Sequence, residues 1–364
     1  MQKHKKIAVM TSYYINNYGS ILQALATKEY LYRMGLDVVF INYVRDNVRN
    51  RKVVNPNWET NIIRKTIYRL YKYVDGRSKE RVFSGYINKH LALTSPFNTK
   101  EDLYNSEIDA DIFCVGSDQM WNSEYNGGVI EENFLGFAPK GKKKISFSTS
   151  MGMTAYNETE VERMKELLDD FSFISVRENS AVEILSTAGL SNVYQMLDPT
   201  LLITDKQWRN IIKIEQMYKN YVLIYQLNDN PDMQEFARNI AREHNLSVIQ
   251  ITYYMSQHWR DIKSIYDPSI EEFVSLIVNA DYVVTDSFHG TAFSINLNKE
   301  FFAFSPEKYS DRINSILSIT GLENRLVQDI DQYAMPNPID YEKIEGILKK
   351  CRQKAELLVK EGLK

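Results

Sequence analysis

The stretch Ala280–Phe304 combines ionisable and hydroxyl side chains with a pattern of strand, turn, helix and strand. Its strand is expected at Tyr282–Thr285, and the polar residues after it are Ser287, His289, Gly290 and Thr291. A helix amino terminus offers free N–H groups and a positive dipole end, which favour an anion, and histidine ionises near neutral pH. Ligands of open α/β sheets bind at such strand–helix junctions, so the stretch predicts an anion-binding site. The alternative is a helix cap or a packed core histidine.

Other expected strands also end in polar residues. The loop Asn16–Ser20 follows the first strand, the segment Gly116–Asn122 (GSDQMWN) follows another, and Arg177 follows a third. Asp118 could act as a base, but aspartate also favours turns and helix caps. Arg177 could contact an anion or pair with Glu178 on the surface. Both residues are therefore candidates whose role depends on what the strand ends bring together.

The elements that must position these groups form two series of alternating strands and helices. The first series opens as strand, helix and strand over Lys6–Asn42, and the second restarts at Tyr221. Such alternation predicts parallel sheets with right-handed crossovers. We predict an α/β protein of two Rossmann-like domains that face each other across a cleft. The predicted bounds are 1–204, 205–340 and, for a C-terminal helix, 341–364.

Length and composition limit the class of protein. A chain of 364 residues exceeds a typical single core, and its net charge of −3 argues against a nucleic-acid partner. We see neither a signal-peptide pattern nor an apolar run of transmembrane length, so a cytoplasmic location is expected. Cys114 and Cys351 lie far apart without a CxxC pair. Neither a disulfide framework nor a metal site is therefore expected.

Several segments together resemble the polysaccharide pyruvyl transferase family. They are the Tyr-Gly-Ser turn, GSDQMWN, SVRENS, LDPTLL, and TDSFHGTAFSI followed by NKEFFAF, spread from about Asn16 to Arg312. The resemblance implies a two-domain architecture like that of GT-B glycosyltransferases. It implies a transferase that moves the enolpyruvyl group of phosphoenolpyruvate onto a sugar of a surface polysaccharide or its precursor, as a ketal. The acceptor would be a glycan or lipid-linked oligosaccharide, which allows peripheral contact with a membrane, and phosphoenolpyruvate would be a co-substrate without a further cofactor.

This chemistry gives the candidate residues expected roles. The donor carries a carboxylate and a phosphate, so its site needs cations and N–H donors. His289 is expected to bind the phosphate or move a proton, and Asp118 to be the base for a sugar hydroxyl. The expected donor-binding residues are Arg177, Ser287, Gly290, Thr291, Lys308 and Arg312. The expected acceptor-binding residues, on the N-terminal side, are Asn17, Tyr18, Gln119, Trp121 and Asn122.

Some alternatives stay open. Some family members carry an arginine where this chain has Ser287, so Lys308 or Arg312 is expected to supply the charge. The same two-domain cleft would suit a GT-B-type glycosyltransferase with a nucleotide-sugar donor. The change at Ser287 also leaves room for a non-catalytic homologue that binds a glycan or an anion. Trp121 could pack in the core instead of stacking on a sugar.

Overall fold

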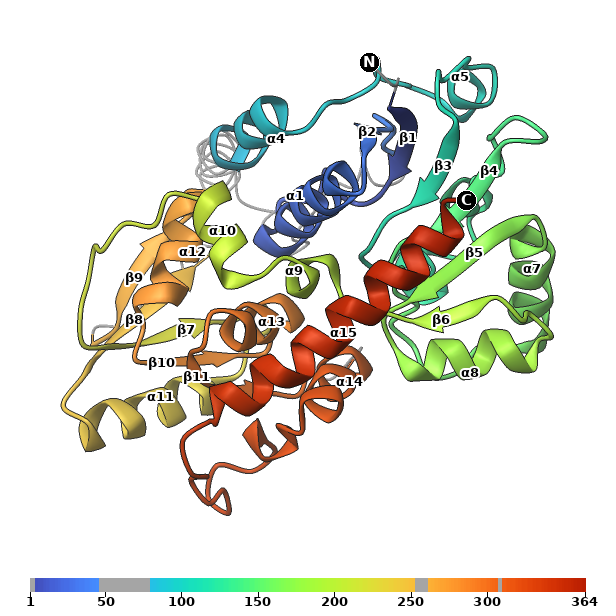
Figure 1. Ribbon diagram of the computed structural model, residues 1–364. Coiled ribbons are helices and arrows are strands. Elements are labelled where there is room, and N and C mark those ends of the chain that lie inside the picture. Colours follow the sequence, from blue (N-terminus) through green and yellow to red (C-terminus); the bar gives the residue numbers. More distant parts are fainter. Residues whose placement is uncertain (1–3, 46–78, 253–260, 307–309) are drawn as a thin grey trace, which may run out of the picture.

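The computed structural model describes residues 4–45, 79–252, 261–306 and 310–364. These residues form two α/β halves, each built on a six-stranded parallel sheet (Figure 1). The prediction of two Rossmann-like halves is therefore confirmed. The predicted boundary after residue 204 falls between the last strand of the first sheet and the first strand of the second. The exact domain limits stay a prediction.

The N-terminal sheet is held by parallel pairs throughout its described length. Its strands, in spatial order, are β2 (Leu36–Phe40), β1 (Lys5–Met10), β3 (Ile112–Val115), β4 (Lys143–Ser146), β5 (Phe171–Val176) and β6 (Val193–Gln195). β3 is buried along its whole length, as expected for a strand covered on both faces. Beyond the end of β4, Thr149 bridges Asp118 on one side and Val176 on the other. This bridge holds together the strand ends that carry the candidate residues.

The C-terminal sheet repeats this design. Its strands, in spatial order, are β12 (Leu326–Val327), β11 (Glu300–Phe304), β10 (Tyr282–Thr285), β7 (Tyr221–Tyr225), β8 (Ser247–Thr252) and β9 (Lys263–Tyr266). β7 and β10 lie side by side in the middle and are almost fully buried. The sheet therefore presents the carboxyl ends of two central strands to the space between the halves.

The helices follow the predicted alternation. They are α1 (Tyr18–Arg33), α4 (Gly85–His90), α5 (Lys100–Tyr104), α6 (Ser123–Asn126), α7 (Glu158–Leu168), α8 (Asn179–Thr187), α9 (Pro199–Leu202), α10 (Asp205–Ile211), α11 (Pro231–Glu243), α12 (Ile270–Asn279), α13 (Phe288–Asn296), α14 (Asp311–Thr320) and α15 (Tyr341–Gly362), with short π or 3₁₀ turns at Glu80–Ser84, Glu131–Phe134 and Glu323–Arg325. α1 begins three residues before the hydrophobic pattern that starts at Ile21, because Asn17 caps it. Ser287 caps α13, so His289 lies in the first turn of this helix, at the helix amino terminus that the sequence predicts.

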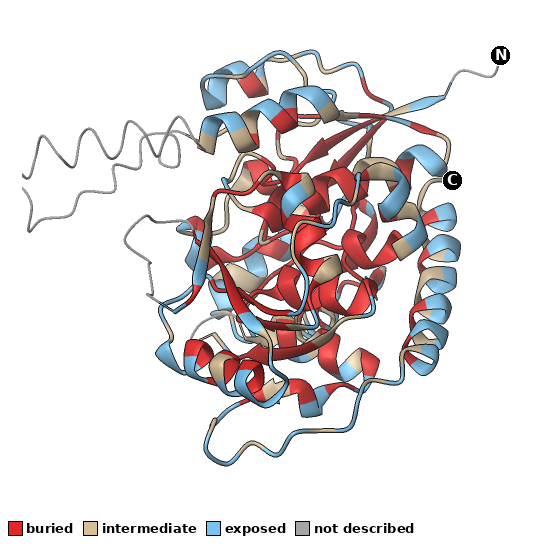
Figure 2. Cartoon of the chain, turned by 90° about the vertical axis from the view of Figure 1, so that its left-hand side faces the viewer, coloured by how far each residue is buried: buried red, intermediate tan, exposed pale blue. Residues whose placement is uncertain are grey.

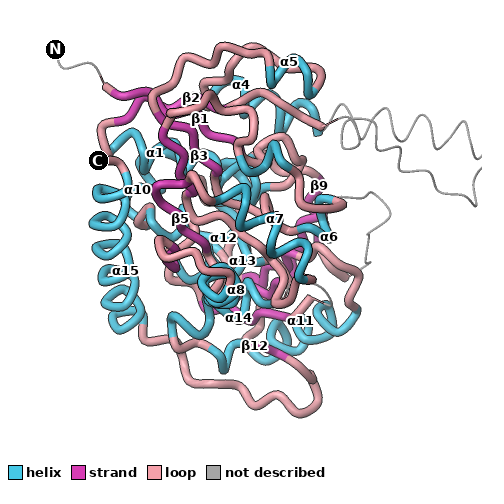
Figure 3. Tube along the Cα trace, turned by 90° about the vertical axis from the view of Figure 1, so that its right-hand side faces the viewer, coloured by secondary structure: helices cyan, strands magenta, loops and turns pink. Residues whose placement is uncertain are grey.

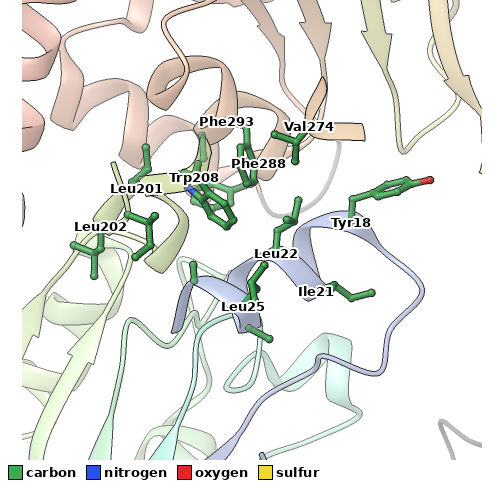
Figure 4. Packing of buried hydrophobic residues seen from close by; sticks show 14 of the residues in the cluster. Tyr18, Ile21, Leu22, Leu25, Leu201, Leu202, Trp208, Val274, Phe288 and Phe293 are labelled. Carbon is green, nitrogen blue, oxygen red and sulfur yellow. The ribbon is translucent and has the colours of Figure 1, made fainter. Parts of the chain in front are cut away.

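A shared hydrophobic core joins the two halves (Figures 2 and 4). Leu22 and Leu25 of α1 pack toward Trp208 and Phe293, which belong to the connecting segment and to α13 (Figure 4). The Trp208 indole N–H donates to the carbonyl of Thr200, at a distance of 2.9 Å. The continuity of this core fixes the two sheets relative to each other.

The last helix, α15, runs along one side of the molecule and touches both halves (Figure 3). Arg352 on this helix donates to the carbonyl of Leu201 and to the side chain of Asn296, at 2.8 and 2.9 Å. Asn296 donates in turn to the carbonyls of Thr200 and Ile203, both at 2.7 Å. These bonds attach α13, which carries His289, to the segment that connects the halves.

Candidate active site

A cleft of about 1010 Å³ lies between the carboxyl edges of the two sheets. Its walls come from the loops after five strands: Ile15, Asn17 and Ser20 after β1; Asp118, Gln119 and Tyr125 after β3; Leu227–Asp232 after β7; Asp286–His289 after β10; Ser305 and Pro306 after β11, with Arg312 of α14. Carboxyl edges of parallel strands are the usual ligand sites of such folds. The expected site residues that line this cleft are Asn17, Asp118, Gln119, Ser287, His289 and Arg312.

Asp118 lies on the N-terminal wall in a left-handed backbone conformation, with φ of 81°. Its carboxylate accepts hydrogen bonds from the Ser20 hydroxyl at 2.7 Å and from the Gln119 N–H at 2.9 Å. Burial alone would raise the pKa of this carboxyl, but its interaction with His289, the positive charge of Arg177 and the hydrogen bond from Ser20 hold the pKa below its usual value. The side chain is therefore an ionised carboxylate, and a lowered pKa makes it a weak base.

His289 faces Asp118 from the C-terminal half, in the first turn of α13. Helices α1 and α13 approach so closely here that a Cβ atom at Gly19 would lie 2.0 Å from Nδ1 of His289. Burial lowers the pKa of His289 to about 4, although Asp198 and Asp118 act in the opposite direction. The imidazole is therefore neutral at pH 7. Its buried Nε2 has no hydrogen-bond partner among the described residues and lies 3.9 Å from Asp198.

Asp198 connects this histidine to an arginine beneath the cleft. Its Oδ2 accepts from Nη1 of Arg177 at 2.6 Å and from the Ser117 hydroxyl at 2.9 Å. Its Oδ1 accepts from the N–H and the hydroxyl of Thr200 at 2.9 and 2.7 Å. Burial opposes ionisation, but the Arg177 charge and these donors lower the pKa of Asp198. A fully satisfied carboxylate thus positions Arg177 and lies within reach of the His289 ring.

Two guanidinium groups flank the Phe288 ring beside His289. The Arg177 guanidinium carbon lies 4.7 Å and that of Arg312 5.9 Å from the ring centre. Arg177 pairs with Glu178 in the interior and not on the surface, with Nε 3.8 Å from Oε1 of that carboxylate. Nη2 of Arg177 and Nε of Arg312 are buried and make no hydrogen bond to any part of the chain that the structure describes. Burial, and then the charge of Arg177, lowers the pKa of Arg312. Buried donors normally have partners, so this arrangement favours an anionic ligand.

The amino terminus of α13 adds further donors. The Ser287 hydroxyl accepts a hydrogen bond from the N–H of Gly290 at 3.3 Å, which identifies Ser287 as the cap. The first backbone N–H groups of the helix have no partner within the helix, and they carry the positive end of its dipole. An anion in the cleft would therefore meet the helix terminus as well as Arg312.

Three of the residues expected to bind the acceptor lie outside the cleft. Tyr18 is buried, stacks on Phe273 with ring centres 4.3 Å apart, and donates its hydroxyl to the Pro268 carbonyl at 2.6 Å. Trp121 is 2% exposed, and its indole N–H donates to the Asn133 carbonyl. Tyr18 and Trp121 thus belong to the core. The geometry does not support direct sugar contacts for them.

Asn122, the third of these residues, is buried beneath the cleft and caps α6. Its Oδ1 accepts from the Tyr125 N–H, and its Nδ2 donates to Gln119, at 2.9 and 2.8 Å. Its observed role is therefore to position two residues that do line the cleft.

Of the residues expected to bind the donor, Ser287 and Arg312 line the cleft, and the other described ones do not. A Cβ atom at Gly290 would lie 2.3 Å from the Thr285 hydroxyl, so this glycine serves the packing of α13 on β10. The Thr291 hydroxyl donates to the Ser287 carbonyl at 3.1 Å and is fully buried. Arg177 lies behind the cleft and not on its wall, and Lys308 lies outside the described residues.

The structure adds residues that the sequence analysis did not place in the site. Asp198 belongs to the LDPTLL segment, but its approach to Arg177 depends on the pairing of β5 with β6, which brings the ends of these strands together. Gly19 was known only as part of a turn, and its packing against His289 depends on how two helices cross. Asp286 lies between the expected strand and Ser287, and its carboxylate accepts from the backbone N–H groups of Leu227 and Asn228 at 2.7 and 2.8 Å.

Two classes of site are not found in the part of the chain that the structure describes. No group of three histidine, cysteine, aspartate or glutamate side chains there could hold a metal ion. No described helix has the length and apolar character needed to cross a membrane.

These features define a two-domain protein of the GT-B class with a buried charged site in the cleft between its halves. The fold is similar to that of a UDP-N-acetylglucosamine 2-epimerase, with a TM-score of 0.54 and 12% identity over 100% of this chain and 98% of that one. It is also similar to a putative UDP-N-acetylglucosamine 2-epimerase from Listeria monocytogenes, with a TM-score of 0.51 and 10% identity over 97% and 91%. At such identities the likeness concerns the fold alone.

The sequence itself defines the family. The family model described as polysaccharide pyruvyl transferase matches residues 17–308, so the chain belongs to this family of transferases. The match includes Asp118, Arg177, Asp198 and His289. No curated protein sequence matches the chain.

Proposed function

We propose that this enzyme transfers the enolpyruvyl group of phosphoenolpyruvate to two hydroxyls of one sugar, on a surface polysaccharide or its precursor, and forms a pyruvate ketal. The observation that carries the proposal is the pair of buried guanidinium nitrogens, Nη2 of Arg177 and Nε of Arg312, that make no hydrogen bond to any described residue. Phosphoenolpyruvate carries a carboxylate and a phosphate, which match two arginines and a helix amino terminus. Family membership supplies the reaction class.

The reaction can be written with its atoms balanced. A proton adds to the methylene carbon of phosphoenolpyruvate, and a sugar hydroxyl attacks the central carbon and loses its own proton. The bond between that carbon and the phosphate oxygen then breaks, and inorganic phosphate leaves. A second hydroxyl of the same sugar attacks the same carbon, gives up its proton to the released phosphate and closes the ketal. The net products are the ketal and phosphate.

We assign proton transfer to His289. Its imidazole is neutral in the empty site, because burial lowers its pKa to about 4, so it can accept a hydroxyl proton. A bound phosphate dianion would raise that pKa and allow the ring to hold the proton. We expected Asp118 to be the base, but its lowered pKa suits it better to stabilise positive charge at the central carbon.

The cation expected opposite Ser287 is assigned to Arg312. Arg312 lines the cleft together with Ser287 and His289, whereas Arg177 lies one layer deeper beside the same Phe288 ring. We propose that Arg312 contacts the donor directly and that Arg177 reinforces the positive potential from below. A non-catalytic role is not favoured by this arrangement, because the neutral histidine, the carboxylate and the cations all meet at one cleft.

The experiment is a phosphate-release assay with phosphoenolpyruvate and a panel of oligosaccharides, with the product examined by mass spectrometry. We expect phosphate release with at least one acceptor and a product mass higher by one pyruvate less one water. Thermal shifts with phosphoenolpyruvate, UDP and inorganic phosphate provide the control. Stabilisation by UDP alone, together with no phosphate release on any acceptor, would support the nucleotide-sugar alternative instead. A lipid-linked acceptor can be tested in the same assay with vesicles.

A further inference from the structure

The outer part of the cleft carries two exposed apolar side chains from opposite halves. Tyr125 of α6 is 45% exposed and Leu227 after β7 is 43% exposed, and both line the cleft. Among the described residues, large apolar side chains this exposed are few. Exposed apolar groups gathered at one hollow indicate a binding surface.

Buried hydrogen bonds hold the segment that carries Tyr125. Asn122 accepts from the Tyr125 N–H, and Asn126 donates to the carbonyls of Gln119, Met120 and Asn122 at 2.9, 3.1 and 2.8 Å. A groove whose backbone is ordered before binding loses less entropy when its ligand arrives. The phenol ring is therefore presented by a fixed turn.

Leu227 is held in a similar way from the other half. Asp286, which is 4% exposed, accepts from the N–H groups of Leu227 and Asn228 and from the side-chain amide of Asn228, at 2.7 to 2.8 Å. Asn230 continues this loop as the cap of α11. The loop after β7 is therefore tied to the end of β10, close to the residues proposed to act on the donor.

Amide side chains line the same cleft as these apolar side chains and the catalytic residues. Asn17, Gln119 and Asn230 line the cleft, and each uses its side-chain oxygen to accept a hydrogen bond within the protein. Their side-chain NH₂ groups make no hydrogen bond to any residue in the described ranges. Amide donors beside an aromatic ring suit a ligand that presents both hydroxyls and apolar C–H faces, which is a sugar.

The charge of the outer wall limits which sugar fits. Asp229 in the loop after β7 and Asp232 in the first turn of α11 line the cleft, and neither has an ion-pair partner among the described residues. The cation of the described wall, Arg312, is assigned to the donor. A carboxylate or phosphate on the acceptor would therefore meet like charge without compensation.

We propose that this outer groove is the acceptor subsite and binds a sugar ring without negative charge, with Tyr125 and Leu227 against its apolar faces. The inference rests on the proposed function, because the sugar must lie beside the donor held by Arg312 and His289. It names two residues outside the motif segments as determinants of acceptor choice. It also names the class of acceptor, a neutral or amine-bearing sugar as opposed to a uronic acid or a phosphorylated sugar.

The test compares Tyr125→Ala with Tyr125→Phe as its matched control. Loss of the ring in Tyr125→Ala is expected to raise the acceptor KM by about tenfold or more. Tyr125→Phe keeps the ring and is expected to retain the wild-type acceptor KM, because the apolar face of the ring binds the sugar. The affinity for phosphoenolpyruvate, measured by calorimetry, is expected to stay within about twofold in both variants, since Tyr125 does not reach the donor. An unchanged acceptor KM in Tyr125→Ala would refute the proposal that the outer groove binds the acceptor.

The predicted preference for an uncharged sugar is tested with two matched acceptors. One is a neutral oligosaccharide, and the other is the same oligosaccharide with one uronic acid in it. We expect kcat/KM to be at least about tenfold higher for the neutral acceptor, and the double variant Asp229→Asn, Asp232→Asn to narrow this ratio. Equal use of both acceptors by the unchanged enzyme would refute the proposed sugar class.

Direct binding separates this inference from the reaction. Calorimetric titration of the neutral oligosaccharide into both Tyr125 variants measures the groove without any turnover. Binding that Tyr125→Ala weakens and Tyr125→Phe retains, in a protein that releases no phosphate from phosphoenolpyruvate, supports the groove and rejects the proposed reaction. Phosphate release with no dependence on Tyr125 supports the reaction and rejects the groove.

Discussion

Replacing Gly19 with alanine should inactivate the enzyme without unfolding it. The new Cβ would lie 2.0 Å from Nδ1 and 2.4 Å from Cγ of His289, whereas ordinary contact begins at 3.4 Å. The imidazole must therefore move by more than an ångström. A displacement of about 1 Å at a reacting group can cost about a hundredfold in rate, so we expect kcat to fall at least that far.

The stability of the same variant should change little. Gly19 lies inside α1, and alanine in a helix is favoured over glycine by about 0.5–1 kcal/mol, which offsets part of the strain at His289. Gly346→Ala in α15 is the matched control, because a Cβ atom there meets nothing within 4 Å. That variant should retain wild-type kcat and gain a little in thermal stability.

The assay is phosphate release, combined with thermal unfolding of each variant and of the double variant Gly19→Ala, His289→Ala. If both changes act through the same imidazole, the double variant should be no slower than His289→Ala alone. A well-folded Gly19→Ala enzyme with wild-type kcat would refute the close contact. Additive losses in the double variant would show that Gly19 acts on something other than His289.

Three more predictions follow from the charges of the site. Arg312→Ala should weaken phosphoenolpyruvate binding by about ten- to a hundredfold in calorimetry, because a hydrogen bond to a charged group contributes roughly 1.5–3 kcal/mol, with wild-type affinity as the refuting result. Arg177→Ala leaves Asp198 as an uncompensated buried charge, so we expect a loss of about 3–5 kcal/mol in unfolding free energy. Adding Asp198→Asn to this variant should restore part of that loss. Equal stability of Arg177→Ala and Arg312→Ala would contradict the buried pair. Below pH 6.5 the unfolded state protonates His289 before the folded state does, so stability should fall by roughly 3 kcal/mol toward pH 4, and His289→Gln should flatten that part of the denaturation curve.

Most of the fold could be predicted from the sequence, because local patterns determine it. The strand Tyr282–Thr285 occupies the expected residues, since its hydrophobic run depends only on neighbours in sequence. The short strand Lys263–Tyr266 was missed because it is an edge strand with a polar start and weak alternation. The helix that starts at Tyr18 was expected to start at Ile21, because its first turn lacks the apolar period.

The residues of the candidate site also differ in how far the local sequence determines their position. His289, Ser287 and Asp118 could be located because each directly follows a strand, and the carboxyl edges of two parallel sheets meet at the cleft. Trp121 and Tyr18 could not be assigned correctly, because whether an aromatic ring packs or lines a wall depends on the partners that the other half supplies. The resemblance to a family identified these segments but could not tell which side chains reach the ligand.

Asp198 and Arg177 show most clearly that a residue can matter without reaching the ligand. Neither residue lines the cleft, and yet both determine its charge. Asp198 takes four donors, so replacing Arg177 would not change what lines the wall but would alter the potential at His289. A sequence pattern records the arginine and the aspartate as separate segments 21 residues apart. Only their 2.6 Å contact shows that they act as one unit, while Nε of the arginine lies 3.8 Å from Glu178 and Nη2 makes no hydrogen bond to any described residue. We therefore propose that the preference of this site for an anionic donor is set one layer beneath the surface that the donor would touch.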